Sequence, residues 1–202
     1  MSLLVSDLRL RWRSLLWWTV AVVLLSALVA SFYKSIAGDP AFEDIYGSLP
    51  ESLEALLGGA DLASPVGYLS SQMYAFFMPA LLLVYAIGRS TSTLAGEEED
   101  HTLDLLLAQP ISRTALYVQK VGGVASGIAV LAIAVAIPVI TLADWSELKV
   151  PAANLWAATA QLFAFVLFFG MLAMTVSASI GRRAAGVGVA AGLAFVTYLI
   201  DG

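Results

Sequence analysis

The chain has 202 residues, of which 60% are apolar and only 12% are charged, and its mean hydropathy is +0.87. A soluble domain has about a quarter of its residues charged, so this composition excludes an ordinary soluble protein and indicates an integral membrane protein. The absence of cysteine excludes disulfides and thiolate metal sites, and the net charge of −5 argues against nucleic acid as a partner.

The first predicted span covers residues 14–33 and follows a charged lead, MSLLVSDLRLRWR. An uncharged stretch of this kind can cross a bilayer, which takes about 20 apolar residues in a helix. No small-residue cleavage site follows soon after the apolar run. We therefore expect a retained anchor and not a cleaved signal peptide.

The acidic segment at about residues 39–60 is predicted to form a short helical element. In SLPESLEALLGG, Ser48 can cap a helix and Glu51 can complete a capping box, while Pro50 suits the first turn. The leucines of this stretch share one face. Two interpretations stay open: an amphipathic helix that lies at the outer membrane interface, or a lid over an exit path.

Four further apolar stretches complete a fold of the all-α class, a polytopic transmembrane helical bundle in a single domain, residues 1–202. The fourth apolar window, from Val150 to Gly181, would extend about 48 Å as one helix. It must therefore tilt, project beyond the bilayer or break. The predicted spans after the first cover residues 66–92, 113–142, 152–180 and 184–200.

Several residues inside the predicted spans could shape the bundle. Pro79 and Pro138 are candidates for kinks. Ala184, Gly188 and Gly192 are small residues spaced by four in the last span, a pattern that permits close helix approach. This pattern fits either ordinary packing within the bundle or an interface between subunits.

Lysine and arginine are distributed unevenly between the two sides of the predicted membrane. With the N-terminus in the cytoplasm, only Lys34 and Lys149 lie outside. The positive-inside rule therefore predicts a cytoplasmic N-terminus, with residues 39–60 outside. The cationic residues on the cytoplasmic side would be Arg9, Arg11, Arg13, Arg89, Arg113, Lys120, Arg182 and Arg183.

No Asp, Glu, Lys, Arg or His lies well inside a predicted apolar window. Ionisable groups in a span usually mark proton or ion relays, so this pattern argues against a proton-coupled carrier. The sequence also lacks the zinc pattern of an intramembrane protease and a Walker-type phosphate loop. We expect no catalytic, cofactor-binding or metal-binding residues, and any energy for transport must come from a partner.

The densest charge lies between the second and third predicted spans, in GEEEDHTLDLLLAQPISR, Gly96 to Arg113. Gly96 permits a change of direction. The acids from Glu97 to Asp100 suit the start of a helix, where the helix dipole favours negative charge. We predict a short cytoplasmic helix at about residues 97–108.

The predicted helix has a leucine face made by Leu103, Leu106 and Leu107. Pro110 disfavours its continuation, and Ser112 can cap the next helix. The helix could pack on its own bundle, lie on the membrane surface or bind a protein. Four consecutive acids make an anionic lipid surface a poor partner, which favours a protein partner.

The stretch AGEEEDHTLDLLLAQPISRTALYVQK resembles the cytoplasmic segment of ABC-2 type transporter permeases. The usual form of that segment is an acidic triplet, then Thr-Leu-(Asp/Glu)-Leu-Leu-Leu, then Pro-(Val/Ile)-Ser-Arg. SLPESLEALLGG and ASPVGYLSSQMYAFFMPALLLVYAIG also resemble the outer helix and second span of the family. The resemblance covers most of Asp39 to Lys120. The chain departs from the family at His101, where Gly is frequent, and in showing five spans where the family usually has six, so the sixth is either truncated or absent.

In that family the segment forms a coupling helix that docks on a separate ATP-binding subunit. The resemblance assigns this ATPase-coupling role to Glu97, Glu98, Glu99, Thr102, Leu103, Asp104, Leu105, Leu106, Leu107, Pro110, Ser112 and Arg113.

The resemblance implies a permease subunit of an ATP-driven ABC exporter in a prokaryotic plasma membrane, with ATP bound by the partner subunit and no cofactor in this chain. The implied partners are an ABC ATP-binding subunit, a second permease copy or homologue in a dimer, and the lipid bilayer. A membrane scaffold or assembly protein without transport is the alternative. A passive channel is disfavoured because the spans lack a ring of polar or charged pore residues.

Overall fold

The computed structural model describes residues 3–36, 64–93, 95–99, 112–143 and 150–201. Every regular element among them is a helix, and five stretches are long and apolar enough to cross a membrane. The predicted all-α polytopic bundle is therefore confirmed, while the outer segment predicted at residues 39–60 lies outside the described residues. The elements are α1 (Leu3–Ile36), α4 (Pro65–Tyr68), the π-helix η1 (Leu69–Phe77), α5 (Met78–Thr91), α6 (Ala95–Glu99), α8 (Arg113–Leu142), α9 (Ala152–Ile180) and α10 (Arg183–Asp201).

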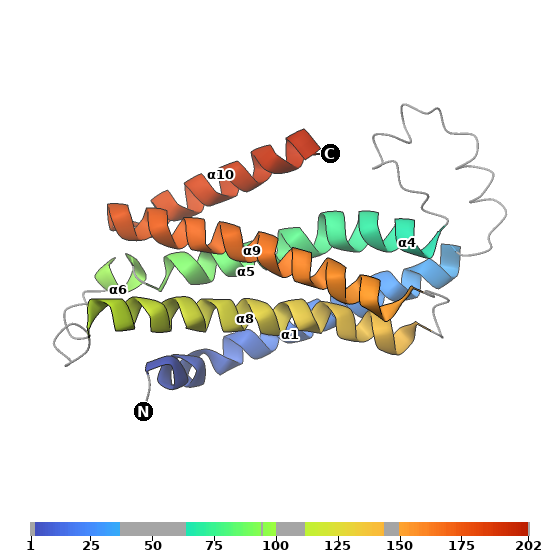
Figure 1. Ribbon diagram of the computed structural model, residues 1–202, viewed down its shortest axis with the longest axis horizontal. Helices are drawn as coiled ribbons and strands as arrows, with labels where there is room; N and C mark the ends of the chain where they lie inside the picture. The colour runs from blue at the N-terminus through green and yellow to red at the C-terminus, as the bar shows by residue number, and fades with distance from the viewer. Residues whose placement is uncertain (1–2, 37–63, 94, 100–111, 144–149, 202) are drawn as a thin grey trace.

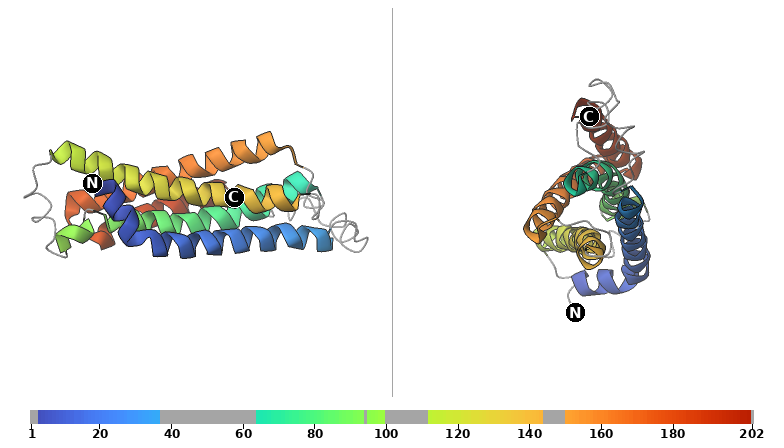
Figure 2. Two further views of the ribbon diagram at one scale, coloured as in Figure 1. Left: turned by 90° about the horizontal axis from the view of Figure 1, so that it is seen from below. Right: turned by 90° about the vertical axis from the view of Figure 1, so that its right-hand side faces the viewer.

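The long helices lie side by side along one axis (Figure 1). Helix α8 packs against α1 on one side and α9 on the other, and α5 packs against α8, α9 and α10. Figure 2 shows α1 and α10 at opposite sides of the bundle. Within the apolar window of α8, 61% is buried, compared with 22% in α1 and 17% in α10. Helix α8 is therefore the centre of the bundle, and α1 and α10 turn most of their apolar surface outward, as helices that face lipid do.

The second span changes helix type along its length, from α4 through η1 to α5. Ser64 caps α4 by accepting a hydrogen bond from the Gly67 N–H at 3.1 Å. Pro79 stands at the second position of α5, directly after η1. Proline has no N–H and its ring crowds the carbonyl four residues earlier, and the wider turns of η1 accommodate both effects. Pro138, in contrast, lies inside α8, which continues to Leu142.

Helix α9 does not break. Its 29 residues correspond to about 44 Å, which matches the thickness of a bilayer with its headgroup regions. Gly181 ends the helix in the left-handed conformation with φ 70°, and its N–H donates to the Ser177 carbonyl at 2.9 Å. Of the alternatives predicted for the long fourth window, the structure excludes the break.

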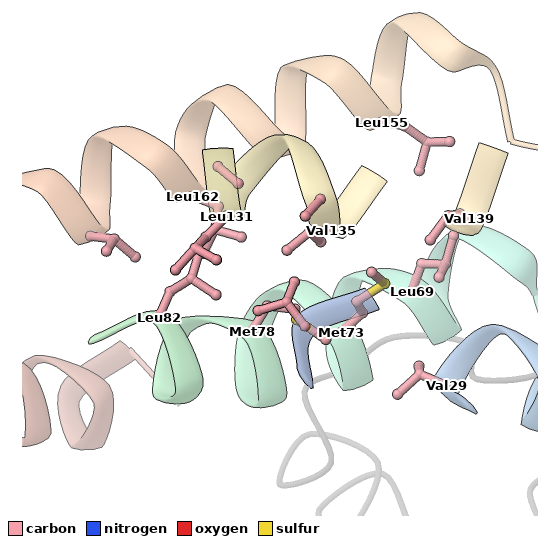
Figure 3. Packing of buried hydrophobic residues seen from close by; sticks show 14 of the residues in the cluster. Val29, Leu69, Met73, Met78, Leu82, Leu131, Val135, Val139, Leu155 and Leu162 are labelled. Atoms are coloured by element: carbon pink, nitrogen blue, oxygen red, sulfur yellow. The ribbon is translucent and has the colours of Figure 1, made fainter. Parts of the chain in front are cut away.

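The core lies between α8, α9, α1 and the second span (Figure 3). Lipid tails are as apolar as the core, so tight packing and hydrogen bonds between helices hold such a bundle together more than the hydrophobic effect does. Tyr68 Oη donates to the Val29 carbonyl at 3.0 Å, and the hydroxyls of Tyr74 and Thr159 lie 3.1 Å apart. The core side chains labelled in Figure 3 are Val29, Leu69, Met73, Met78, Leu82, Leu131, Val135, Val139, Leu155 and Leu162.

Helix α10 contacts the bundle through a stripe of small residues, Gly186, Ala190 and Ala194, all buried. A Cβ added at Gly186 would lie 2.5 Å from the Ala173 carbonyl oxygen and 2.7 Å from Ser177 Cβ, so only glycine allows this approach. The stripe noted in the sequence is the neighbouring one. At Gly188 and Gly192 of that stripe, an added Cβ would meet no heavy atom of the described residues within 4 Å.

The close contact at Gly186 yields a first prediction. Gly186→Ala should lower the free energy of unfolding by about 1–3 kcal/mol, because overpacking forces α10 away from α9. The matched control is Gly188→Ala on the same helix, where there is room for the methyl group and the gain in helix propensity is the same. Thermal unfolding of the protein in detergent measures both, and equal midpoints for the two variants would contradict the packing.

Candidate functional site

The candidate site lies at the end of the bundle that carries α6, called here the α6 end. The starts of α1 and α8 and the turn between α9 and α10 lie at the same end (Figure 1). Most of the cationic side chains in the described residues belong to the helix ends that meet there, whereas Lys34 is in the last turn of α1, at the opposite end. Those at the α6 end are Arg13, Arg89, Lys120, Arg182 and Arg183.

The chain does not turn at Gly96. Helix α5 ends at Thr91, and the Ser92 N–H still donates to the Gly88 carbonyl at 3.2 Å. Gly96 lies inside α6, and Gly181 is the residue in the described chain that has the positive φ of a glycine turn. The predicted turn at Gly96 is therefore wrong. A Cβ at Gly96 would lie 2.9 Å from the Arg183 guanidinium, so this glycine makes room for a side chain from another helix.

Glu97 joins α6 to α8. Lys120 Nζ donates to Glu97 Oε1 in a hydrogen-bonded ion pair. The two side chains are only 9% and 17% exposed. A lysine this deeply buried needs an anionic partner, since an unpaired charge away from water is costly. This pair fixes the position of α6 against the central helix of the bundle.

Glu99 joins α6 to the start of α10. Arg183 Nε lies 3.0 Å from Glu99 Oε2, and the Arg183 backbone N–H donates to Glu99 Oε1 at 2.9 Å. Arg183 Nη2 also donates to the Gly96 carbonyl at 2.9 Å. The carboxylate lies at the N-terminus of α10, where the helix dipole favours negative charge. The pair is more exposed than Glu97–Lys120, at 37% and 40%, so its contribution to stability is smaller.

Glu98 lies beside the turn between α9 and α10. A Cβ at Gly181 would be 3.1 Å from Glu98 Oε1. Gly181 is thus needed twice, for its positive φ and for the approach of this carboxylate. The three glutamates of α6 therefore face three parts of the bundle: α8, the α9–α10 turn and the start of α10.

The predicted site residues fall partly inside the described chain. Glu97, Glu98 and Glu99 lie in α6. Ser112 caps α8 by accepting a hydrogen bond from the Ala115 N–H at 3.2 Å, which confirms the predicted cap, and Arg113 is the first residue of α8. The residues outside the described chain are Thr102, Leu103, Asp104, Leu105, Leu106, Leu107 and Pro110. Their coupling role, and that of the three glutamates, stays a prediction.

Sequence reasoning missed the partners of the glutamates. The sequence places Lys120 and Arg183 only among the cationic residues of the cytoplasmic side. A signal for Lys120 does exist, because it is the last charge before a long apolar run and such a lysine usually has a partner. Nothing local indicates that Arg183 meets Glu99, since 84 residues separate them.

The fold and this site define a multi-pass membrane protein. The described residues form five candidate spans, and ion pairs join α6 to α8 and to α10 at one end of the bundle. Residues 1–201 match the family described as "ABC-2 family transporter protein", and the chain belongs to this family. It is an ABC transporter permease, and membership implies an ATP-binding partner subunit. No curated protein sequence and no solved structure matches the chain.

The buried pair of α6 and α8 yields a second prediction. Lys120→Met leaves Glu97 buried without this cation, and we expect the free energy of unfolding to fall by about 3 kcal/mol. Adding Glu97→Gln to Lys120→Met removes the stranded charge and should restore part of the loss. Denaturant unfolding in mixed micelles measures this, with Val118→Met on the exposed face of α8 as the control. A double variant that loses the sum of both single effects would contradict the pairing.

Proposed function

We propose that this permease is the membrane subunit of an ATP-driven exporter, which moves its substrate by using ATP hydrolysis on a separate ATP-binding subunit. That subunit would dock on the segment at residues 97–108. Family membership supports the permease part. The observation that carries the coupling part is the bonding of α6 to both α8 and α10, because a docking segment can move the spans only if it is joined to them.

The orientation belongs to the same proposal. The cationic side chains gathered at the α6 end agree with a cytoplasmic location of this end, since lysine and arginine concentrate on the cytoplasmic side of membrane proteins. The N-terminus, which lies at the same end (Figure 1), would then also be cytoplasmic. In the cell membrane this arrangement would present α6 and the segment after it to a soluble ATPase.

The energy source is inferred from where charges lie in the spans. Arg13, Arg89 and Lys120 stand near the ends of their apolar stretches, and the middle of each stretch is free of ionisable residues. A proton-coupled carrier usually needs such a residue near the middle of the bilayer. The charge pattern therefore favours energy delivered from outside the membrane, as ATP hydrolysis on a partner would deliver it.

The mechanism follows from two copies working together. The proposed complex contains two ATP-binding subunits, and each of them would bind one permease chain, either a second copy of this chain or a homologue. Closure of the two ATPases around ATP would displace the docking segments, and α6 would pass that displacement to α8 and to the α9–α10 turn. The bundles would then rock toward an outward-open state, and hydrolysis would reset them.

This proposal yields a third prediction, for the chain purified from cells that naturally produce it. We expect copurification of a protein with Walker motifs and ATPase activity. Leu106→Asp should abolish that association, because a buried leucine contributes roughly 1.5–3 kcal/mol and a buried charge adds a penalty. Pull-down with mass spectrometry and an ATPase assay measures both effects.

The control for this prediction is Leu53→Asp in the predicted outer segment, a matched leucine-to-aspartate change. It should leave the ATPase association at the wild-type level. Wild-type association in a well-inserted Leu106→Asp variant would show that the segment is a connector and not a docking element.

A further inference from the structure

We infer that Arg183 is a positioning residue for energy coupling, which holds α6 to the α9–α10 turn so that movement of the docking segment reaches the last two spans. This inference rests on the proposed function. Arg183 makes three polar contacts with α6: an ion-pair contact between its Nε and Glu99 Oε2 at 3.0 Å, a hydrogen bond from its backbone N–H to Glu99 Oε1 at 2.9 Å, and a hydrogen bond from its Nη2 to the Gly96 carbonyl at 2.9 Å.

Helix α6 needs external support to keep its place. It has five residues, and helices this short are not stable through their own hydrogen bonds. Its position is therefore set by the side chains that hold it, Lys120 on the α8 side and Arg183 on the α10 side. Displacement of α6 would therefore reach α8 through Lys120 and α10 through Arg183.

The two routes differ in burial. Lys120 is 9% exposed and Glu97 17%, whereas Arg183 is 37% exposed and Glu99 40%. A buried pair holds its geometry, while a half-exposed one is screened by salt and exchanges with water. The Arg183 contact is thus the weaker attachment of α6, so a single substitution there can loosen α6 from α10 while the Lys120 contact still holds it to α8.

Two glycines keep α6 and the α9–α10 turn close enough for these bonds. At Gly96, an added Cβ would lie 2.9 Å from each of three atoms of the Arg183 side chain, Cζ, Nε and Nη2. At Gly181, an added Cβ would lie 3.1 Å from Glu98 Oε1. Because the guanidinium is the far end of a flexible side chain, Gly96→Ala should displace Arg183 without unfolding α6.

Helix α10 is the span with the smallest buried share among the described spans. It is joined to α9 and α5 through its stripe of small residues, while 17% of its apolar window is buried. Displacement of α6 would act on this helix at its start, where Arg183 stands.

The test uses the complex of the full chain with its copurified ATPase, made without cysteine in the ATPase. Spin labels at Val130→Cys on α8 and Val189→Cys on α10, both exposed, report the distance between the helices by double electron–electron resonance. We expect a difference between the nucleotide-free and the ATP–vanadate-trapped complex. Arg183→Ala and Gly96→Ala should keep the ATPase bound and lose this difference. Glu99→Arg with Arg183→Glu should restore at least part of it.

Two matched controls separate transmission from general damage. Arg182→Ala removes the adjacent, exposed arginine, and Gly88→Ala adds a methyl group where no described heavy atom lies within 4 Å. Both should keep the distance difference.

The outcomes distinguish the two proposals. If the wild-type chain binds no ATPase, the proposed function fails and this inference falls with it. If the ATPase binds and the distance difference persists in both Arg183→Ala and Gly96→Ala, only the inference is overturned. Loss of ATPase binding in Arg183→Ala also overturns it, because Arg183 would then serve docking and not transmission.

Discussion

The pairing of the α6 glutamates with cations of α8 and α10 is the interaction on which the rest of this end of the bundle depends. A helix of five residues is not stable through its own hydrogen bonds. A lysine side chain that is only 9% exposed needs an anionic partner, because an unpaired buried charge is costly. Glu97–Lys120 and Glu99–Arg183 meet both requirements together. They place α6 between the central helix and the last hairpin, so the segment that follows α6 starts from a fixed point on the bundle.

The spans differ in how much of their apolar surface is buried within the bundle. Helix α8 is buried along most of its apolar length and packs against α1, α5 and α9, so it has little freedom to move by itself. Helix α10 packs against α9 and α5 with Gly186, Ala190 and Ala194 buried, and most of its large apolar side chains are exposed. In a bilayer those side chains contact lipid at little cost, because lipid and core are equally apolar. The bundle therefore combines a largely buried central helix with a last helix that exposes most of its apolar surface.

Local features of this structure could be predicted from the sequence, and long-range ones could not. Long apolar windows predict the five spans because a helix must satisfy its own backbone in lipid, and the Ser112 cap is a contact over three residues. The Glu99–Arg183 contact bridges 84 residues, so it depends on how α5, α9 and α10 pack. Gly96 shows the limit most clearly: its freedom suggests a turn, yet its real use is the space it leaves for Arg183.

The account requires that the α6 end face the cytoplasm, where an ATPase can reach it, and single-cysteine labelling tests this most directly. The native chain has no cysteine, so Thr114→Cys at the α6 end and Val66→Cys at the opposite end each give one thiol, both at exposed positions. With a membrane-impermeant maleimide on intact cells, the account predicts labelling of Val66→Cys, and labelling of Thr114→Cys only after permeabilisation. Labelling of Thr114→Cys but not Val66→Cys in intact cells would contradict the account, because α6 would then lie on the side away from any cytoplasmic ATPase.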